Sequence, residues 1–145
     1  MRSLWGVASL VLMGLFGCNT TPTSPSESQP AAPDRVLSFQ ERSAANAATI
    51  VVTRDQGFTL GGGCFYALFI NGTLAARFEP GETASFYVEP GEILLRVGRD
   101  PYGRGLCAVQ QDEWTQRETL MRAGETKHFR LLITTNGKAD IQRAE

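Results

Sequence analysis

Few residues of this 145-residue chain could do chemistry, and the most notable are three cysteines and one histidine. Cys18 has the most informative position, because it closes an apolar stretch, residues 4–16, that has Arg2 as the only charge before it. A positive start and an apolar core of roughly 7–15 residues are typical of a secretory signal. The stretch is too short to span a bilayer. The sequence therefore predicts export, with a thiol at the end of the signal.

The end of this segment, Leu15-Phe16-Gly17-Cys18, resembles the lipobox of bacterial lipoproteins. Phe16 stands where that family usually has a small residue. The resemblance implies that the signal is cut before Cys18, that Cys18 is diacylated, and that the new N-terminus is acylated too. Asn19 in place of an aspartate implies the outer membrane, on its periplasmic face. The alternative is an ordinary signal peptide whose cysteine is coincidental.

If Cys18 carries lipid, Cys64 and Cys107 remain as a pair. An exported domain lies in an oxidising compartment, so the sequence predicts a disulfide between them. The alternative is a metal or redox site built on two cysteines. The single histidine and the absence of a CxxC spacing count against that alternative.

Other catalytic signatures are missing from the sequence. The GxGxxG, P-loop and HExxH patterns are absent. His128 is the lone histidine, and the glutamates beside the two Pro-Gly turns are expected to solvate those turns. The net charge is −1 with no basic block, which argues against a nucleic-acid partner. We therefore expect a protein that is not an enzyme and that needs no metal or cofactor.

A loop at residues 98–105 is the candidate binding loop. It places Arg99, Asp100, Tyr102 and Arg104 between glycines. Loops on a rigid scaffold often carry binding residues, and Arg and Tyr are enriched at interface hot spots. A solvated connector is the alternative.

The elements that must position this loop are short strands. Alternating apolar residues separated by turn signals predict strands at residues 49–53, 64–70, 73–78, 83–88, 93–97, 106–109, 115–121, 127–134 and 139–143. This spacing predicts an all-β, antiparallel β-sandwich of about 7–9 strands over residues 48–145, of the immunoglobulin or transthyretin-like kind. Phe65 and Phe69 fall opposite the cysteine face. They need cover from the N-terminal segment (Val36, Leu37, Phe39) or from a partner.

The chain before the sandwich divides into two parts. Residues 1–17 are the predicted signal, and residues 18–47 are rich in Ser, Thr and Pro at their start. Such a composition buries little apolar surface, so we expect a disordered tether. A capping box at residues 38–41, followed by an alanine-rich run, allows a short helix before the sheet.

One stretch, residues 70–97, resembles PEGA-type β-sandwich modules, through its Asn71-Gly72 hairpin and its two Pro-Gly turns. The plan of lipid, tether and sandwich is also similar to the transthyretin-like lipoprotein of type VI secretion systems. These resemblances imply a surface-associated module without catalytic machinery. We expect a lipoprotein that acts as an interaction or structural module, with the membrane and an envelope protein as partners. The alternatives are a small-ligand or glycan binder, and a hydrolase whose site the sequence does not reveal.

Overall fold

Nine strands and two short 3₁₀ helices form the secondary structure of the computed structural model, which describes residues 20–57 and 63–145. Cys18 and the predicted signal lie outside the described residues. The elements follow one another as β1 (Gln29–Pro30), η1 (Pro33–Arg35), β2 (Ala48–Arg54), β3 (Tyr66–Ile70), β4 (Thr73–Phe78), β5 (Glu82–Val88), β6 (Gly91–Arg99), η2 (Gly105–Ala108), β7 (Trp114–Met121), β8 (Thr126–Ile133) and β9 (Ala139–Arg143). No helix in this part of the chain is long and apolar enough to cross a membrane.

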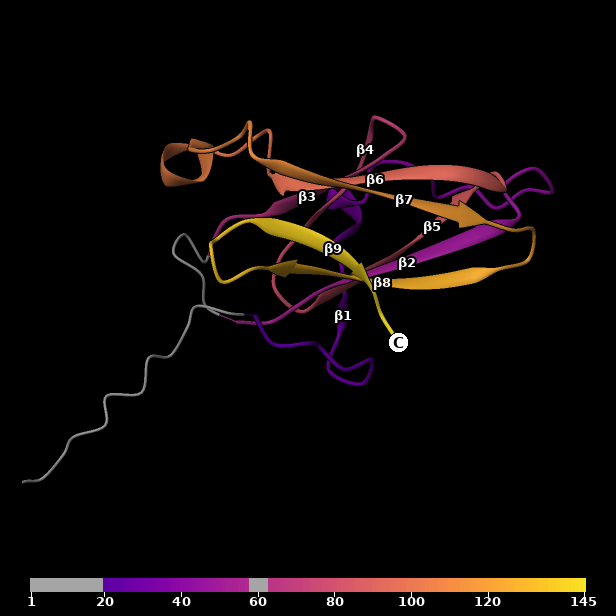
Figure 1. Ribbon diagram of the computed structural model, residues 1–145, viewed down its shortest axis with the longest axis horizontal. Coiled ribbons are helices and arrows are strands. Elements are labelled where there is room, and N and C mark those ends of the chain that lie inside the picture. The colour runs from indigo at the N-terminus through magenta and orange to yellow at the C-terminus, as the bar shows by residue number, and fades with distance from the viewer. Residues whose placement is uncertain (1–19, 58–62) are drawn as a thin grey trace, which may run out of the picture.

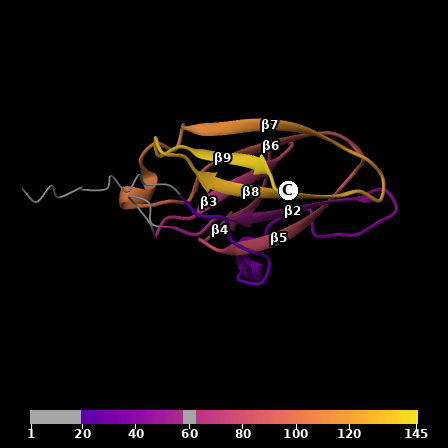
Figure 2. The ribbon, with the colours of Figure 1, turned by 60° about the horizontal axis from the view of Figure 1, so that its bottom comes forward.

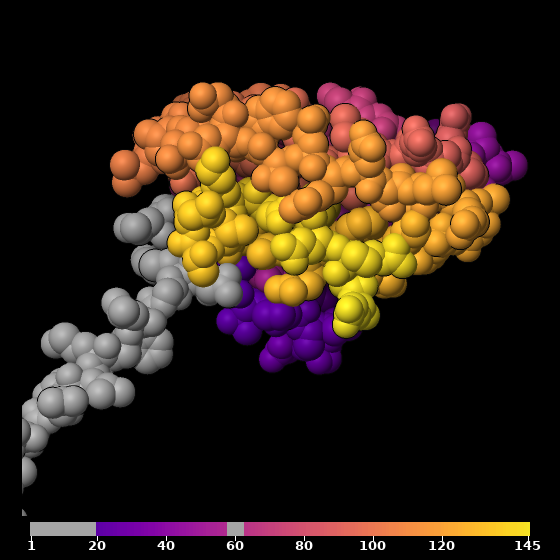
Figure 3. Space-filling model, in the orientation of Figure 1, coloured from indigo at the N-terminus to yellow at the C-terminus, as the bar shows by residue number. Residues whose placement is uncertain are grey.

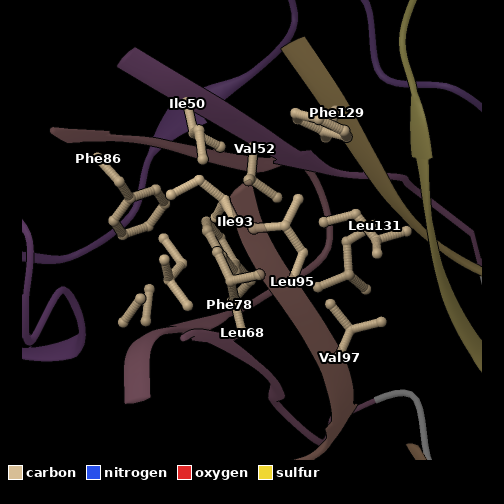
Figure 4. Packing of buried hydrophobic residues seen from close by; sticks show 14 of the residues in the cluster. Ile50, Val52, Leu68, Phe78, Phe86, Ile93, Leu95, Val97, Phe129 and Leu131 are labelled. Atoms are coloured by element: carbon tan, nitrogen blue, oxygen red, sulfur yellow. The ribbon is translucent and has the colours of Figure 1, made fainter. Parts of the chain in front are cut away.

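The strands form two sheets that face each other. One sheet has the order β1-β5-β2-β8-β9 and the other has the order β4-β3-β6-β7 (Figure 1). Period-two alternation sends apolar side chains of both sheets inward, where Ile50, Phe86 and Leu131 meet Leu68 and Leu95 (Figure 4). The predicted all-β sandwich is confirmed.

The sheets are mostly antiparallel, but two pairings are parallel. β2 runs parallel to β8, and β1 runs parallel to β5. A parallel pair needs a long crossover connection, and the whole four-stranded sheet lies in the chain between β2 and β8. The predicted antiparallel sandwich thus also contains two parallel pairs, which the hairpin signals do not reveal because they report only on strands that are adjacent in the chain.

The predicted disordered tether is wrong for residues 20–47, because this segment lies along the sandwich. The Gln29 amide donates to Gly81 O at 3.0 Å, and the Leu37 amide donates to Ala75 O at 2.8 Å. Arg35 forms a bidentate ion pair with Glu82, at 2.5 and 2.6 Å. The composition of this segment indicates that it buries too little apolar surface to become ordered. Backbone hydrogen bonds and this ion pair hold it in place instead.

The short helix allowed at residues 38–48 is also absent. Phe39 has a φ of +62°, a left-handed conformation that does not continue a right-handed helix. The Gln40 side chain donates to Ser85 O at 2.9 Å, and the Tyr87 amide donates to Phe39 O at 2.8 Å. The segment therefore pairs with β5 instead of with itself.

The predicted disulfide is confirmed, with the Cα atoms of Cys64 and Cys107 5.4 Å apart. Cys107 lies in η2, a 3₁₀ turn, and not in the strand predicted at residues 106–109. Gly105 has a φ of +59°, which breaks an extended backbone, and the Cys107 amide closes a turn onto Arg104 O at 3.0 Å. The disulfide therefore fixes a loop to the start of β3.

Candidate functional site

Asp100, one of the predicted loop residues, is a structural residue. Its carboxylate is 2% exposed and forms a bidentate ion pair with Arg77 of β4, at 2.9 and 2.5 Å. The same carboxylate accepts the Tyr102 amide at 3.0 Å, and the Asp100 carbonyl accepts Gln111 Nε2 at 3.0 Å. Because each oxygen of Asp100 accepts a hydrogen bond within the fold and the residue is buried, it shapes the loop and is not accessible to a ligand.

The guanidinium groups of two arginines lie over the ring of Phe65. The Arg77 guanidinium lies 4.9 Å from the Phe65 ring centroid and 5.2 Å from that of Tyr102. Arg35, from the N-terminal segment, lies 4.8 Å from the Phe65 centroid. The segment thus supplies part of the cover, as predicted, but through a cation. The apolar residues expected in this role lie elsewhere: Val36 and Phe39 pack against the core cluster, and Leu37 is exposed.

Arg96 occupies a comparable position over two rings farther along the same outer sheet face. Its guanidinium lies 4.3 Å from the Phe69 centroid and 4.6 Å from the Trp114 centroid. The strand register explains this contact, since Arg96 is opposite Phe69 on β3 and Trp114 is opposite Gly98 on β6. A Cβ at Gly98 would lie 2.9 Å from the Trp114 Cβ. A glycine at this position therefore leaves room for Trp114 on the neighbouring strand.

The arginines of the described chain differ in how they are paired. Four of them have a carboxylate partner within 4.0 Å: Arg35, Arg77, Arg117 and Arg130. Arg96 and Arg99 form no ion pair with any described residue. The Arg99 guanidinium lies 5.5 Å from the ring centroid of the buried Tyr66, so Arg96 is the one of the two whose guanidinium lies over the outer-face rings without a carboxylate.

Both of these arginines line a cleft of about 220 Å³ at the base of the predicted loop. We call it the arginine–tryptophan cleft, and its lining residues are Phe69, Arg96, Gly98, Arg99, Pro101, Gln111 and Trp114. Guanidinium groups in a fixed position recognise carboxylates and phosphates by paired N–H donors. Contact with two aromatic rings restrains Arg96 and leaves its N–H edge as the recognition element. The cleft is thus suited to an anionic group next to an aromatic or apolar one.

The predicted loop residues do not converge on one site. Arg99 lines the cleft, Asp100 is buried in its ion pair, and Tyr102 is 65% exposed. Arg104 is exposed, and it has no ion-pair partner in the described part of the chain. His128 lies on β8 in the other sheet and lines a separate hollow. The described residues contain no group of three or more His, Cys, Asp or Glu side chains that could hold a metal.

Larger hollows exist, but their charges differ. The largest one described, about 590 Å³, lies beside the turn between β5 and β6, and its charged lining residues are all acidic: Glu41, Glu89 and Glu92. The hollow beside His128, about 550 Å³, has a single arginine, Arg130, which is already paired with Asp55 at 2.5 Å. The arginine–tryptophan cleft is therefore distinguished by Arg96, which has no carboxylate partner among the described residues, and not by its size.

Sequence reasoning found Arg99 but missed Arg96, Gln111 and Trp114. The alternation of apolar residues at 93, 95 and 97 places Arg96 on the outward face of its strand, but its aromatic neighbours come from other strands. Gly98 two residues later was the available signal, because a glycine in a strand often marks a close approach. Comparisons with protein-family models, curated proteins and solved structures find no match to this chain. Its function is therefore inferred from its own geometry.

Proposed function

We propose that the chain is a lipid-anchored, non-enzymatic binding module of the bacterial envelope, held by Cys18 on the periplasmic face of the outer membrane. Its binding site is the arginine–tryptophan cleft, and its partner is an envelope protein that presents a carboxylate. The lipobox-like ending at Cys18 supports the anchor. The cleft supports the binding role.

The observation that carries the binding proposal is the state of Arg96. It lies within 4.3 and 4.6 Å of two ring centroids, lines the cleft, and has no carboxylate partner among the described residues. Arg77 and Arg117 of the same sheet each pair with an aspartate of the fold. A carboxylate from a partner would form with Arg96 the kind of ion pair that Asp100 forms with Arg77.

The composition of the cleft favours binding over catalysis. Its lining residues supply donors and aromatic surface, and none of them is a carboxylate, a histidine or a thiol. General acid–base or nucleophilic catalysis needs such a group within reach of the substrate. We therefore assign the cleft no reaction.

A carboxylated sugar is a second candidate for the same site. Trp114 is 47% exposed, and an exposed indole gives a flat surface of the size that a sugar ring covers. Arg96 would then hold the carboxylate of that sugar while Trp114 covers its apolar face.

The anchor is tested by growing cells with an alkyne-bearing fatty acid. The wild-type chain should take up the label, and Cys18→Ser should lose it, because the acylated sulfur is gone. Label on Cys18→Ser, or none on the wild type, would contradict the anchor.

The cleft is tested by placing a photo-crosslinking amino acid at Gln111 in intact cells. A discrete protein adduct should form and should disappear when Arg96→Gln is added. Arg122→Gln is the matched control, because Arg122 is an exposed arginine at the opposite end of β7. An adduct that survives Arg96→Gln would refute the carboxylate proposal, and a polysaccharide adduct lost with Arg96→Gln would favour the sugar.

A further inference from the structure

The folded body of this protein begins very close to Cys18. Thr20 is 8% exposed, and its hydroxyl accepts the Ile133 amide at 3.1 Å. Thr21 pairs with Gln56 through two backbone hydrogen bonds, at 2.7 and 3.0 Å. One residue, Asn19, therefore separates Cys18 from the first residue fixed to the sandwich.

This short connection limits how far the sandwich can stand from a lipid on Cys18. Two residues span at most about 7 Å, whereas the disordered tether expected from composition would reach roughly 20–24 Å. A diacylated Cys18 places its thioether at the bilayer surface. The end of the sandwich that carries Thr20, which we call the Thr20 end, must then lie against the lipid headgroups.

The loop that joins β6 to β7 lies at this same end. Thr20 is bound at the end of β8, and the hairpin that follows contributes Lys138 to a narrow gap lined also by Gln110 and Glu113 of the loop. Figures 1 and 2 show the orange loop and the β8–β9 hairpin at one end of the molecule. In the space-filling view their atoms lie side by side (Figure 3).

The loop exposes large side chains with apolar surface. Leu106 is 79% exposed, Tyr102 is 65% exposed and Val109 is 49% exposed, all within eight residues. The loop is nonetheless held in place, by the Cys64–Cys107 disulfide and by the buried Asp100. Exposed apolar side chains on a restrained loop mark a contact surface.

We propose that this loop is a second membrane contact, with Leu106 and Val109 entering the bilayer interface and Tyr102 lying at the level of the headgroups. The inference rests on the proposed acylation of Cys18. Leucine and valine lose water-exposed apolar area on entry, and a tyrosine ring has one apolar side and one polar tip, as the interface requires.

The charges at this end show which force drives the contact. Arg104 and Lys138 are balanced by Asp112 and Glu113, all of which are exposed. The exposed side chains described at this end therefore carry no excess of positive charge to attract anionic lipid, and apolar burial must supply most of the affinity. A weak contact is enough, because the acyl anchor on Cys18 is only two residues from Thr20. It therefore keeps the loop at a high effective concentration near the membrane surface.

The test uses the mature protein in vesicles of phosphatidylethanolamine and phosphatidylglycerol that contain phosphatidylcholine brominated on its acyl chains. Bromine quenches tryptophan only at membrane depth. The two variants are Leu106→Trp and Leu120→Trp, each with Trp114→Phe, so that removal of Trp5 with the signal leaves one tryptophan. Leu120 is the matched control, because it is a 52% exposed leucine near the opposite end of β7.

We expect loss of emission for the tryptophan at 106 and none for the tryptophan at 120, with little change when phosphatidylglycerol is left out. Equal quenching of the two tryptophans, or an unquenched tryptophan at 106, would refute the proposed membrane contact of the loop. The exposed side chains of the loop would then indicate a protein partner. The mass of the N-terminal peptide is measured on the same sample. An acylated peptide with no quenching refutes the docking alone, whereas an unacylated peptide refutes the anchor and the docking together.

Discussion

The two ends of the sandwich connect their strands by different means. The end opposite Thr20 uses tight turns, such as Asn71-Gly72, where φ is +48° and +82°, and the Asn71 side chain accepts the Leu94 amide at 2.9 Å. The Thr20 end also has a tight turn, at Asn136-Gly137 between β8 and β9, but in addition it carries the long β6–β7 loop, the disulfide and the Asp100–Arg77 ion pair. It also holds Arg54, 3% exposed, which donates to the carbonyls of Cys64 and Phe78.

The difference shows where local and long-range interactions each determine the structure. At the far end, turn residues such as Asn71-Gly72 set the backbone of a hairpin locally, and the Asn71 side chain adds one hydrogen bond to Leu94 of β6. At the Thr20 end, partners come from distant parts of the chain, and the pKa of Arg54 is lowered to about 10 because burial removes its water. The Thr20 end is therefore costly to order, and it presents most of the exposed large apolar side chains of the described chain.

The largest effect should come from removing the disulfide. Cys64 and Cys107 are 43 residues apart, and constraint of the unfolded chain by such a loop contributes about 4 kcal/mol. Cys107→Ala should lower the free energy of unfolding in urea by roughly 2–5 kcal/mol. The far-end comparison is Gly72→Ala, which forces a side chain onto a φ of +82° and should cost roughly 1–2 kcal/mol. Equal losses would mean that the two ends are not stabilised differently.

A smaller loss should follow removal of the ion pair under the loop. Arg77→Met leaves the buried Asp100 carboxylate without its partner, and we expect a loss of about 2–3 kcal/mol in the same urea experiment. With Asp100→Asn already present, Arg77→Met should cost much less, because no charge is stranded. Losses that simply add in the double variant would contradict a coupled pair.

Acid should weaken the Thr20 end through Glu82. Burial raises the pKa of this carboxyl, but hydrogen bonds from Arg35 and the Glu79 amide outweigh burial, and the net pKa lies below its ordinary value of 4.5. A lowered pKa in the folded state means that the carboxylate stabilises the fold above about pH 4.5, and that this stabilisation is lost as the pH falls through the folded-state value. Unfolding free energies measured from pH 7 to pH 3 should therefore fall less steeply for Glu82→Gln than for wild type. Parallel curves would exclude Glu82 as a source of the acid sensitivity.

The smallest effect on stability is expected for the exposed leucines. Leu106→Ser and Leu120→Ser should each change the free energy of unfolding by less than about 0.5 kcal/mol, because neither side chain is buried. This result would show that Leu106 is available for contact with a membrane. A loss above about 1 kcal/mol for Leu106→Ser would mean that the side chain packs within the fold instead.

The same contrast explains what the sequence could predict. Alternation placed Ile93, Leu95 and Val97 on the inner face, and Asn71-Gly72 identified a hairpin, because both signals are local. Residues 20–47 were misread because their order comes from backbone hydrogen bonds to β4 and β5, which composition does not encode. Arg96 was missed as a site residue because its two rings arrive from β3 and β7.

Hydrogen exchange of the membrane-bound mature protein, followed by mass spectrometry, tests most directly whether the folded body begins at Thr20. The amides of Gln29, Ala31 and Leu37 donate to Gly81, Thr83 and Ala75 carbonyls at 2.8–3.0 Å. We predict that these amides exchange far more slowly than in an unfolded peptide, as the strands do. Exchange at the unfolded-peptide rate through residues 20–37 would mean a free tether, and the sandwich would then be able to stand away from the bilayer.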